Sequence, residues 1–319
     1  MGFLVLLLLG VGLVWGPLQK YRQVNRARQA LLESQPERAL DALQSLNADR
    51  PNDAQINYLL ARAYRRTGNL KQAQSHLEQA QRSGWSSEEV NQQRHLALLQ
   101  SGQIQETAAF FKRLLNQGVS DEIAVEFYEA QAMALLHGYR FKEAMVCLNY
   151  WIDWRPQDVR PRMWRGEIWD RILYHKDAIR EYSSVLEVAP DHLDARRHLA
   201  KSLFESHKFE QALEHYQQCT QIDSSDTEAR IGVAQCNLRL LNIDVAEQQL
   251  RALLQVDLND DQRTRVAIVL ATLVLDKKQP QEAIRILDDL KGLAKTNPEA
   301  LYVLGRAYNQ TGDSAKGSK

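Results

Sequence analysis

The sequence of 319 residues has few of the residues that interrupt helices, with only 15 glycines and 8 prolines. Alanine, leucine, glutamine, glutamate and arginine are abundant instead, and these residues favour helix over strand. The chain also lacks a net charge, because 40 basic side chains balance 40 acidic ones. A nucleic-acid-binding protein generally needs a basic surface to neutralise phosphates. We therefore predict an all-α fold and no nucleic-acid partner.

Sequence signatures of catalytic, nucleotide-binding and metal sites are missing as well. The chain has no HExxH, CxxC, GxGxxG, GxxxxGK[ST] or GxSxG pattern. Three isolated cysteines, Cys147, Cys219 and Cys236, fall within predicted helices and are interpreted as small buried residues in a reducing compartment. We predict that the protein is not an enzyme and has no catalytic residue, cofactor, metal site or small-molecule substrate.

The first eighteen residues, MGFLVLLLLGVGLVWGPL, contain no charged side chain. As a helix they would span about 27 Å, which nearly crosses the hydrocarbon core of a bilayer. A cleaved signal peptide is the alternative, but no lysine or arginine precedes the apolar run, and Pro17 disfavours cleavage after Gly16. We therefore predict that residues 1–18 form one transmembrane anchor.

Four basic residues follow the apolar run directly, namely Lys20, Arg22, Arg26 and Arg28. Under the positive-inside rule this asymmetry places the amino terminus outside and the rest of the chain in the cytoplasm. An alternative interpretation is that these cations are simply the solvated surface of the first helix. The alternative location for the repeats is the periplasmic or extracytoplasmic side.

The chain after the apolar run repeats itself. Five of the seven spacings between corresponding positions are 34 residues and two are 37. The recurring small position is occupied by Ala39, Ala73, Thr107, Ala144, Ala178, Ala212, Ala246 and Ala283. A large apolar residue occurs four positions after each member of this series, and a small residue occurs twelve positions before most of them. Pairs of helices that each bury one apolar face have this spacing. His95 and Thr107 depart from the pattern, so we expect looser packing in the third copy.

This register resembles the tetratricopeptide repeat family, whose 34-residue pattern W-x2-L-G-x2-Y, A-x3-F and P is matched in degenerate form. One clear copy consists of Gly166, Trp169, Ala178, Tyr182 and Pro190. A second consists of Asn57, Leu60, Ala61, Tyr64, Gly68, Ala73, Leu77 and Ala80. The resemblance implies a right-handed α-solenoid of antiparallel helix pairs, here preceded by the transmembrane helix.

We predict a division into the anchor at 1–18, repeats one to three at 19–120, repeats four to seven at 121–260, and repeat eight with a half-repeat at 261–319. The 37-residue spacings fall near 118–123 and 259–263, and they set these boundaries. The layout resembles bacterial membrane-anchored tetratricopeptide proteins of envelope assembly, including lipopolysaccharide assembly regulators. Those proteins carry a cysteine-paired, rubredoxin-like end that is absent here, so their particular function does not transfer.

In the family, the first helices of the repeats line a concave groove that holds an extended peptide or a helix. The matching register, with the adjacent Trp164, predicts a partner-binding groove made of Tyr58, Arg62, Arg65, Arg66, Arg160, Met163, Trp164, Glu167, Arg171, Arg197, Lys201 and Phe204. Its arginines favour an acidic peptide segment. The asparagines that family members use to clamp a terminal carboxylate are absent, and the arginines are equally compatible with a plain solvated surface.

The leading functional hypothesis is a membrane-anchored, non-catalytic scaffold that binds proteins or assembles complexes. One alternative is a permanent accessory subunit of a larger membrane complex, bound through the outer surface near Trp154 and Trp164. Those tryptophans are equally compatible with stabilising a helix junction, although tryptophan is enriched at protein interfaces. A second alternative is an envelope-side assembly or secretion factor.

Overall fold

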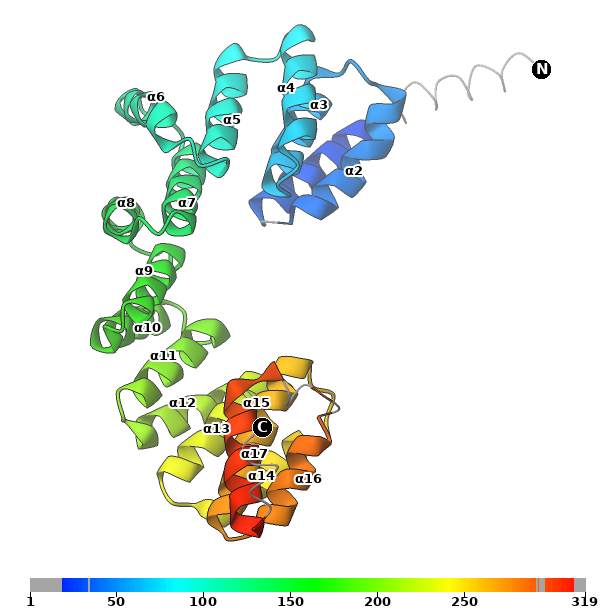
Figure 1. Cartoon of the computed structure of the whole chain (residues 1–319). Coiled ribbons are helices and arrows are strands. Elements are labelled where there is room, and N and C mark those ends of the chain that lie inside the picture. The colour runs from blue at the N-terminus through cyan, green and yellow to red at the C-terminus, as the bar shows by residue number, and fades with distance from the viewer. Residues whose placement is uncertain (1–18, 34, 291, 293–295, 313–319) are drawn as a thin grey trace, which may run out of the picture. The chain divides into compact units, whose positions relative to one another are not determined.

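The structure is a computed structural model that describes residues 19–33, 35–290, 292 and 296–312. All regular secondary structure in these residues is helical (Figure 1), which confirms the predicted all-α class. The predicted anchor, residues 1–18, lies outside the described residues. Within the described part, no helix combines the length and apolar character needed to cross a bilayer.

Helical residues 19–32 come first, and labelled helices follow in chain order. The first labelled group is α2 (Pro36–Asp49), α3 (Ala54–Arg66), α4 (Leu70–Arg82), α5 (Ser87–Gln100), α6 (Ile104–Asn116), α7 (Asp121–His137) and α8 (Phe141–Trp154). The second group is α9 (Arg160–Arg171), α10 (His175–Val188), α11 (Leu193–Glu205), α12 (Phe209–Ile222), α13 (Thr227–Arg239), α14 (Ile243–Leu253), α15 (Asp260–Asp276), α16 (Pro280–Asp288) and α17 (Pro298–Thr311).

The chain divides into two compact units, Met1–Trp151 and Ile152–Lys319, whose boundary falls within α8. In both units the helices pair in sequence, as α3 does with α4 and α11 with α12. First helices of successive repeats also contact one another, as α5 does with α3 and α7, and α13 with α11. The first helices of each unit therefore form a shared surface, which we call the first-helix face.

The recurring alanines form the interior of the helix pairs. Ala39, Ala73, Ala144, Ala178, Ala212, Ala246 and Ala283 are almost completely buried, and so is Thr107. The large residues four positions later are buried too, from Leu43 in the first repeat to Leu287 in the eighth. The predicted packing role of this register is confirmed.

Gly166 has a packing role that no other residue type could fill without movement. A Cβ atom at this position would lie 2.5 Å from Cε1 of Tyr182. The Tyr182 ring is therefore pressed against the backbone of α9, and it is fully buried there. Gly232 and Tyr216 repeat the arrangement, with the corresponding Cβ 2.5 Å from Cζ of the tyrosine.

The turns inside the repeats share a left-handed residue that the sequence pattern alone does not reveal. Positive φ angles occur there at Gly68, Gly102, Tyr139, Leu173, His207, Leu241, Lys278 and Gly312. The turn at Leu173 shows the geometry: the N–H of Tyr174 donates to the Trp169 carbonyl at 2.8 Å, and that of Leu173 to Asp170 at 3.0 Å. This pattern is the Schellman motif, which ends a helix by satisfying its last carbonyls.

The two 37-residue spacings lengthen first helices. α7 and α15 each contain 17 residues, whereas α3, α11 and α13 each contain 13. Asn259 begins α15 with a capping box, because its side chain accepts from the Gln262 N–H and the Gln262 side chain accepts from the Asn259 N–H. The three added residues thus become nearly one helical turn, and the subdivision at 120 and 260 stays a prediction.

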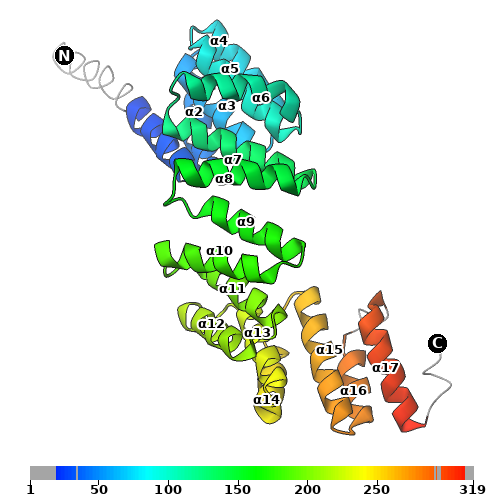
Figure 2. The same ribbon diagram turned by 90° about the vertical axis from the view of Figure 1, so that its left-hand side faces the viewer.

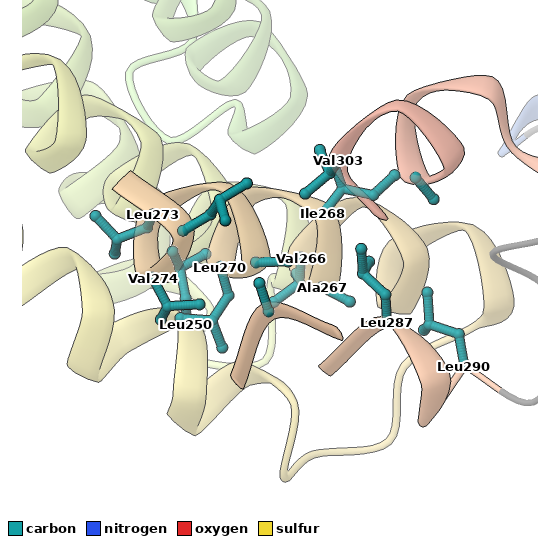
Figure 3. Packing of buried hydrophobic residues seen from close by; sticks show 14 of the residues in the cluster. Leu250, Val266, Ala267, Ile268, Leu270, Leu273, Val274, Leu287, Leu290 and Val303 are labelled. Atoms are coloured by element: carbon teal, nitrogen blue, oxygen red, sulfur yellow. The ribbon is translucent and has the colours of Figure 1, made fainter. Parts of the chain in front are cut away.

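The last helices of the second unit share one apolar core. Figure 2 shows α15, α16 and α17 side by side, and Figure 3 shows their inward side chains. Leu270 and Val274 of α15 lie in one cluster with Leu287 of α16, Val303 of α17 and Leu250 of α14. The α17 helix, which is the predicted half-repeat, is therefore integrated into the core of the unit.

Candidate protein-interaction surfaces

Three predicted groove arginines of the first unit converge on one buried carboxylate. Arg62, Arg65 and Arg66 lie in the last turns of α3, and Glu126 lies in α7. Glu126 Oε1 accepts from Nη2 of Arg62 at 2.6 Å and of Arg66 at 2.7 Å, and Oε2 accepts from Nη2 of Arg65 at 2.5 Å. We call these four residues the arginine cluster. It connects two first helices that are separated by the whole of repeat three.

Additional groups hold the arginine cluster in place. Arg65 Nε donates to Oε1 of Gln93 on α5 at 2.9 Å. Arg62 also pairs with Glu122, and Arg66 also donates to the Leu31 carbonyl. Arg62, Arg65 and Glu126 are all buried. The three guanidinium groups are therefore engaged inside the protein.

The charges of the cluster stabilise one another against the cost of burial. Burial alone would raise the pKa of Glu126, but Arg65, Arg62 and Arg66 outweigh it and bring the pKa down to about 2. Burial also opposes the charge on Arg62, yet Glu126 raises the pKa of that guanidinium above its ordinary value. Burial lowers the pKa of Arg65, although a guanidinium stays protonated throughout the pH range of folded proteins. The cluster therefore remains ionised at neutral pH.

Tyr58, another predicted groove residue, is buried beside the arginine cluster. Its ring stacks on Trp85 with the centroids 4.9 Å apart, and burial raises the pKa of its hydroxyl to about 12. A cavity of about 350 Å³ is lined by Tyr58, Arg62 and Trp85, and also by Glu88 and Glu122. Because acidic and basic groups both line it, this cavity has no clear preference for an anionic ligand.

In the second unit, three predicted groove residues are used mainly for packing or local pairing. Met163 is buried in the core shared by α9 to α13, and Trp164 packs against the same core. Arg160 donates to Asp158 from Nη2 at 2.7 Å. Trp164 is thus partly buried against this core, and its role in partner binding stays a prediction.

Two cations of the second unit are placed differently. Arg171 on α9 and Lys201 on α11 are exposed, and neither forms an ion pair within the described residues. Their helices are held together by the neighbouring residues, since Ser202 Oγ donates to Asp170 Oδ1 at 2.8 Å. Arg171 and Lys201 therefore belong to helical turns that meet at this bond.

The remaining predicted groove residues surround these two cations. Glu167 on α9 is partly buried, and burial raises the pKa of its carboxyl group, against the opposing effect of Arg171. Arg197 on α11 pairs with Asp194 and with Asp226, the latter at 3.1 Å. The half-buried Phe204 ring lies 5.3 Å from that of Phe209 and has the Arg239 guanidinium 5.9 Å from its centre. The first-helix face of the second unit thus combines the exposed cations Arg171 and Lys201 with acidic groups and an aromatic side chain.

No group of three or more histidine, cysteine, aspartate or glutamate side chains in the described residues could hold a metal ion. All three cysteines are free and buried. Burial raises the pKa of Cys147 and Cys236 to about 12 and that of Cys219 to about 11. Their thiols are accordingly protonated and unreactive at neutral pH.

Sequence reasoning missed the partners of the arginines. Glu126 and Glu122 lie about sixty residues from Arg62, so no local spacing identifies the contact. The signal present in the sequence was that a first helix rich in arginine, α3, is followed two repeats later by a first helix rich in glutamate, α7. A second missed feature is an apolar groove between α6 and α8, for which the irregular third copy was the only indication.

The helices and their surfaces define a helical repeat protein, a class in which stacked helix pairs present extended binding surfaces. Models of the tetratricopeptide repeat match residues 30–84 and 203–273, and another such model matches residues 175–227. The chain therefore contains tetratricopeptide repeats, which typically mediate protein–protein interactions without catalysis.

Several solved structures resemble the chain. PilF of Pseudomonas aeruginosa has 16% sequence identity and a TM-score of 0.51, over 60% of this chain and 86% of PilF. A tetratricopeptide repeat protein from Parabacteroides merdae has 11% identity and a TM-score of 0.45, over 91% and 99% of the two chains. YrrB, described as having an unusual peptide-binding site, has 12% identity and a TM-score of 0.42, over 53% and 86%. No curated protein sequence matches the chain.

Proposed function

We propose that the protein is a non-catalytic scaffold, anchored in a membrane by residues 1–18, whose cytoplasmic repeats bind acidic segments of partner proteins. The observation that supports this most directly is the pair of exposed cations, Arg171 and Lys201, on helices joined by the Asp170–Ser202 bond. An acidic peptide lying across α9 and α11 would supply the carboxylates that these cations lack. Phe204 adds an apolar contact on the same helix as Lys201.

The first unit supports the choice of this surface. Its arginines already contact Glu126, so an acidic peptide would have to displace a buried carboxylate before binding there. Binding to Arg171 on α9 and Lys201 on α11 would not require the displacement of a buried carboxylate. The proposed binding surface therefore comprises Arg171, Lys201 and Phe204, with Arg197 and Glu167 beside them.

The test is co-purification from native membranes with the Arg171→Glu/Lys201→Glu double variant. We expect partners of the wild-type protein to be lost, and an excess of an acidic synthetic peptide to displace them from the wild type. The matched control is Lys176→Glu/Lys208→Glu, which reverses two exposed cations on or beside second helices. Recovery of the same proteins with both double variants would refute binding through this surface.

The membrane orientation needs a separate experiment. Reporter domains that are active on only one side of the membrane can be fused after Lys319 in the full chain. Activity of the cytoplasmic reporter is expected, because the cations that follow the apolar run favour that side. Activity of the extracytoplasmic reporter alone would instead support the envelope-side assembly or secretion factor.

A permanent accessory subunit is the second candidate, and the exposure of Trp154 favours it. This large aromatic side chain is 39% exposed at the end of α8. Exposed tryptophans are frequent anchors of stable interfaces. Trp154→Ala is therefore expected to release the protein from its complex under this reading, whereas charge reversal at Arg171 and Lys201 would leave the complex intact.

A further inference from the structure

The first unit contains an apolar groove on the side of its second helices, away from the arginine cluster. Its walls are α6 and α8 and its floor is α7, and its volume is about 660 Å³. The α6 wall consists of Ile104, Ala108, Phe111 and Leu115, which recur at helical spacing on one face. Val146, Cys147 and Tyr150 form the α8 wall. We call this feature the α6–α8 groove.

The groove borders the irregular third repeat, to which α6 belongs. His95 stands where most other copies have a small residue, and its ring stacks on Phe110 of α6 with the centroids 3.8 Å apart. A ring at this position prevents the close backbone approach that alanine or glycine allows. Accordingly α6 packs more sparsely on α5 and α7 than α4 does on α3. Of the α6 wall, Ile104 and Phe111 are buried, whereas Ala108 is exposed and Leu115 is partly exposed at the groove.

The chemistry of the groove favours a helical occupant. The apolar residues of α6 extend over about 16 Å, or three helical turns. The floor and walls offer few hydrogen-bonding groups, apart from Tyr128 and Gln131 on the floor and Tyr150 on the α8 wall. An extended peptide would leave backbone groups unpaired against such a surface, whereas a helix satisfies its own.

The rim of the groove defines the charge of the occupant. Lys112 of α6 and Lys142 of α8 line the groove, and neither forms an ion pair within the part of the chain that the structure describes. The one acidic rim residue, Glu143, already accepts from Arg140 Nε at 2.8 Å. The rim therefore presents two uncompensated positive charges.

We propose that the α6–α8 groove binds an amphipathic helix of a partner protein, with an apolar stripe facing the groove and acidic residues facing Lys112 and Lys142. This surface is separate from the cations of α9 and α11, so its occupancy does not depend on the acidic-peptide function. It gives the first unit a binding role although its arginines are internally engaged.

The test uses the full chain and a fluorescent synthetic peptide of about 18 residues, with leucine along one face and glutamate on the other. Fluorescence anisotropy is expected to show binding, and a peptide with lysine in place of glutamate is expected to bind at least about tenfold more weakly. The Lys112→Glu/Lys142→Glu double variant should reverse this preference. Equal affinity for the two peptides, or no binding of either, would overturn the proposal.

Matched valine variants locate the binding. Val146→Glu introduces a charge into the α8 wall at a side chain that is 53% exposed, so the fold should tolerate it. Val245→Glu makes the same change on α14, where the side chain is 49% exposed. We expect Val146→Glu to weaken peptide binding by about tenfold or more, and Val245→Glu to leave the affinity unchanged. The helix-binding groove would be refuted if both variants lost equal affinity. It would also be refuted if a fatty acid bound in the groove and the peptide did not.

Discussion

The Glu126→Gln substitution would remove the charge that three arginines share while keeping nearly the same side-chain volume. Glu126 is buried and accepts from Arg62, Arg65 and Arg66. After the substitution, three guanidinium groups would remain close together, offset by the half-exposed Glu122 and by the charge of Glu129 near Arg65. The perturbation therefore tests whether the arginine cluster stabilises the first unit.

Two independent arguments give the size of the effect. Removing one partner of a buried ion pair typically costs about 3–5 kcal/mol. The pKa of Glu126 falls from an ordinary value of 4.5 to about 2, which corresponds to about 3 kcal/mol of stabilisation. We expect Glu126→Gln to lower the free energy of unfolding of the first unit by about 3 kcal/mol at neutral pH.

The pH dependence provides a second readout with a defined sign. Because the pKa of Glu126 is lower in the folded than in the unfolded protein, its stabilisation is present above about pH 4.5 and is lost as the pH falls toward 2. The difference between wild type and Glu126→Gln should therefore shrink by more than half by about pH 3. Urea titrations followed by circular dichroism, with hydrogen exchange at α3 and α7 amides, measure this difference.

The control is Glu122→Gln. The Glu122 side chain is 45% exposed and pairs with Arg62, and pairs of this kind contribute less than about 1 kcal/mol. The reasoning is refuted if both variants lose equal stability, or if the Glu126→Gln difference is the same at neutral and acidic pH.

Three further predictions concern other parts of the fold. Gly166→Ala should destabilise the second unit by about 1–3 kcal/mol, because the new Cβ would overlap the Tyr182 ring; a denaturant midpoint unchanged from wild type would contradict this packing. Leu241→Gly should stabilise the protein by up to about 1 kcal/mol, since Leu241 is exposed and has a φ of 62°; thermal unfolding measures it, and a lower melting temperature would argue against strain at the turn. Burial raises the pKa of Glu167, so the folded protein favours the protonated form of this carboxyl group. The resulting stabilisation is complete at pH values below the pKa that Glu167 has in the unfolded chain, and it is lost as the pH rises. Glu167→Gln should thus raise the melting temperature at neutral pH and leave it unchanged near pH 4, whereas a decrease at neutral pH would show that the charge of Glu167 is favourable.

The sequence predicted the parts of the fold that repeat. The alanine register identified the buried positions correctly, because helical spacing alone determines which residues face the partner helix. It did not identify the left-handed turn residues such as Leu173. Leucine is an unusual choice at a positive φ, and the constraint there comes from closing the turn between two packed helices.

The candidate site was predictable in outline and not in its contacts. The register placed Arg66 and Arg171 at the same position of their repeats, yet the structure pairs the first with Glu126 and leaves the second exposed. The difference depends on how closely α7 approaches α3, which follows from the packing of all the intervening helices. No local pattern around either arginine contains that information.

The contact between α3 and α7 also affects how the first unit unfolds. In most repeat arrays each repeat contacts only its immediate neighbours, so the ends can open while the remainder stays folded. Glu126 instead joins the second repeat to the fourth through Arg62, Arg65 and Arg66. The third repeat cannot melt freely while those ion pairs hold its neighbours together. Residues from α3 to α7 should therefore unfold as one cooperative block, in the manner of a small globular domain.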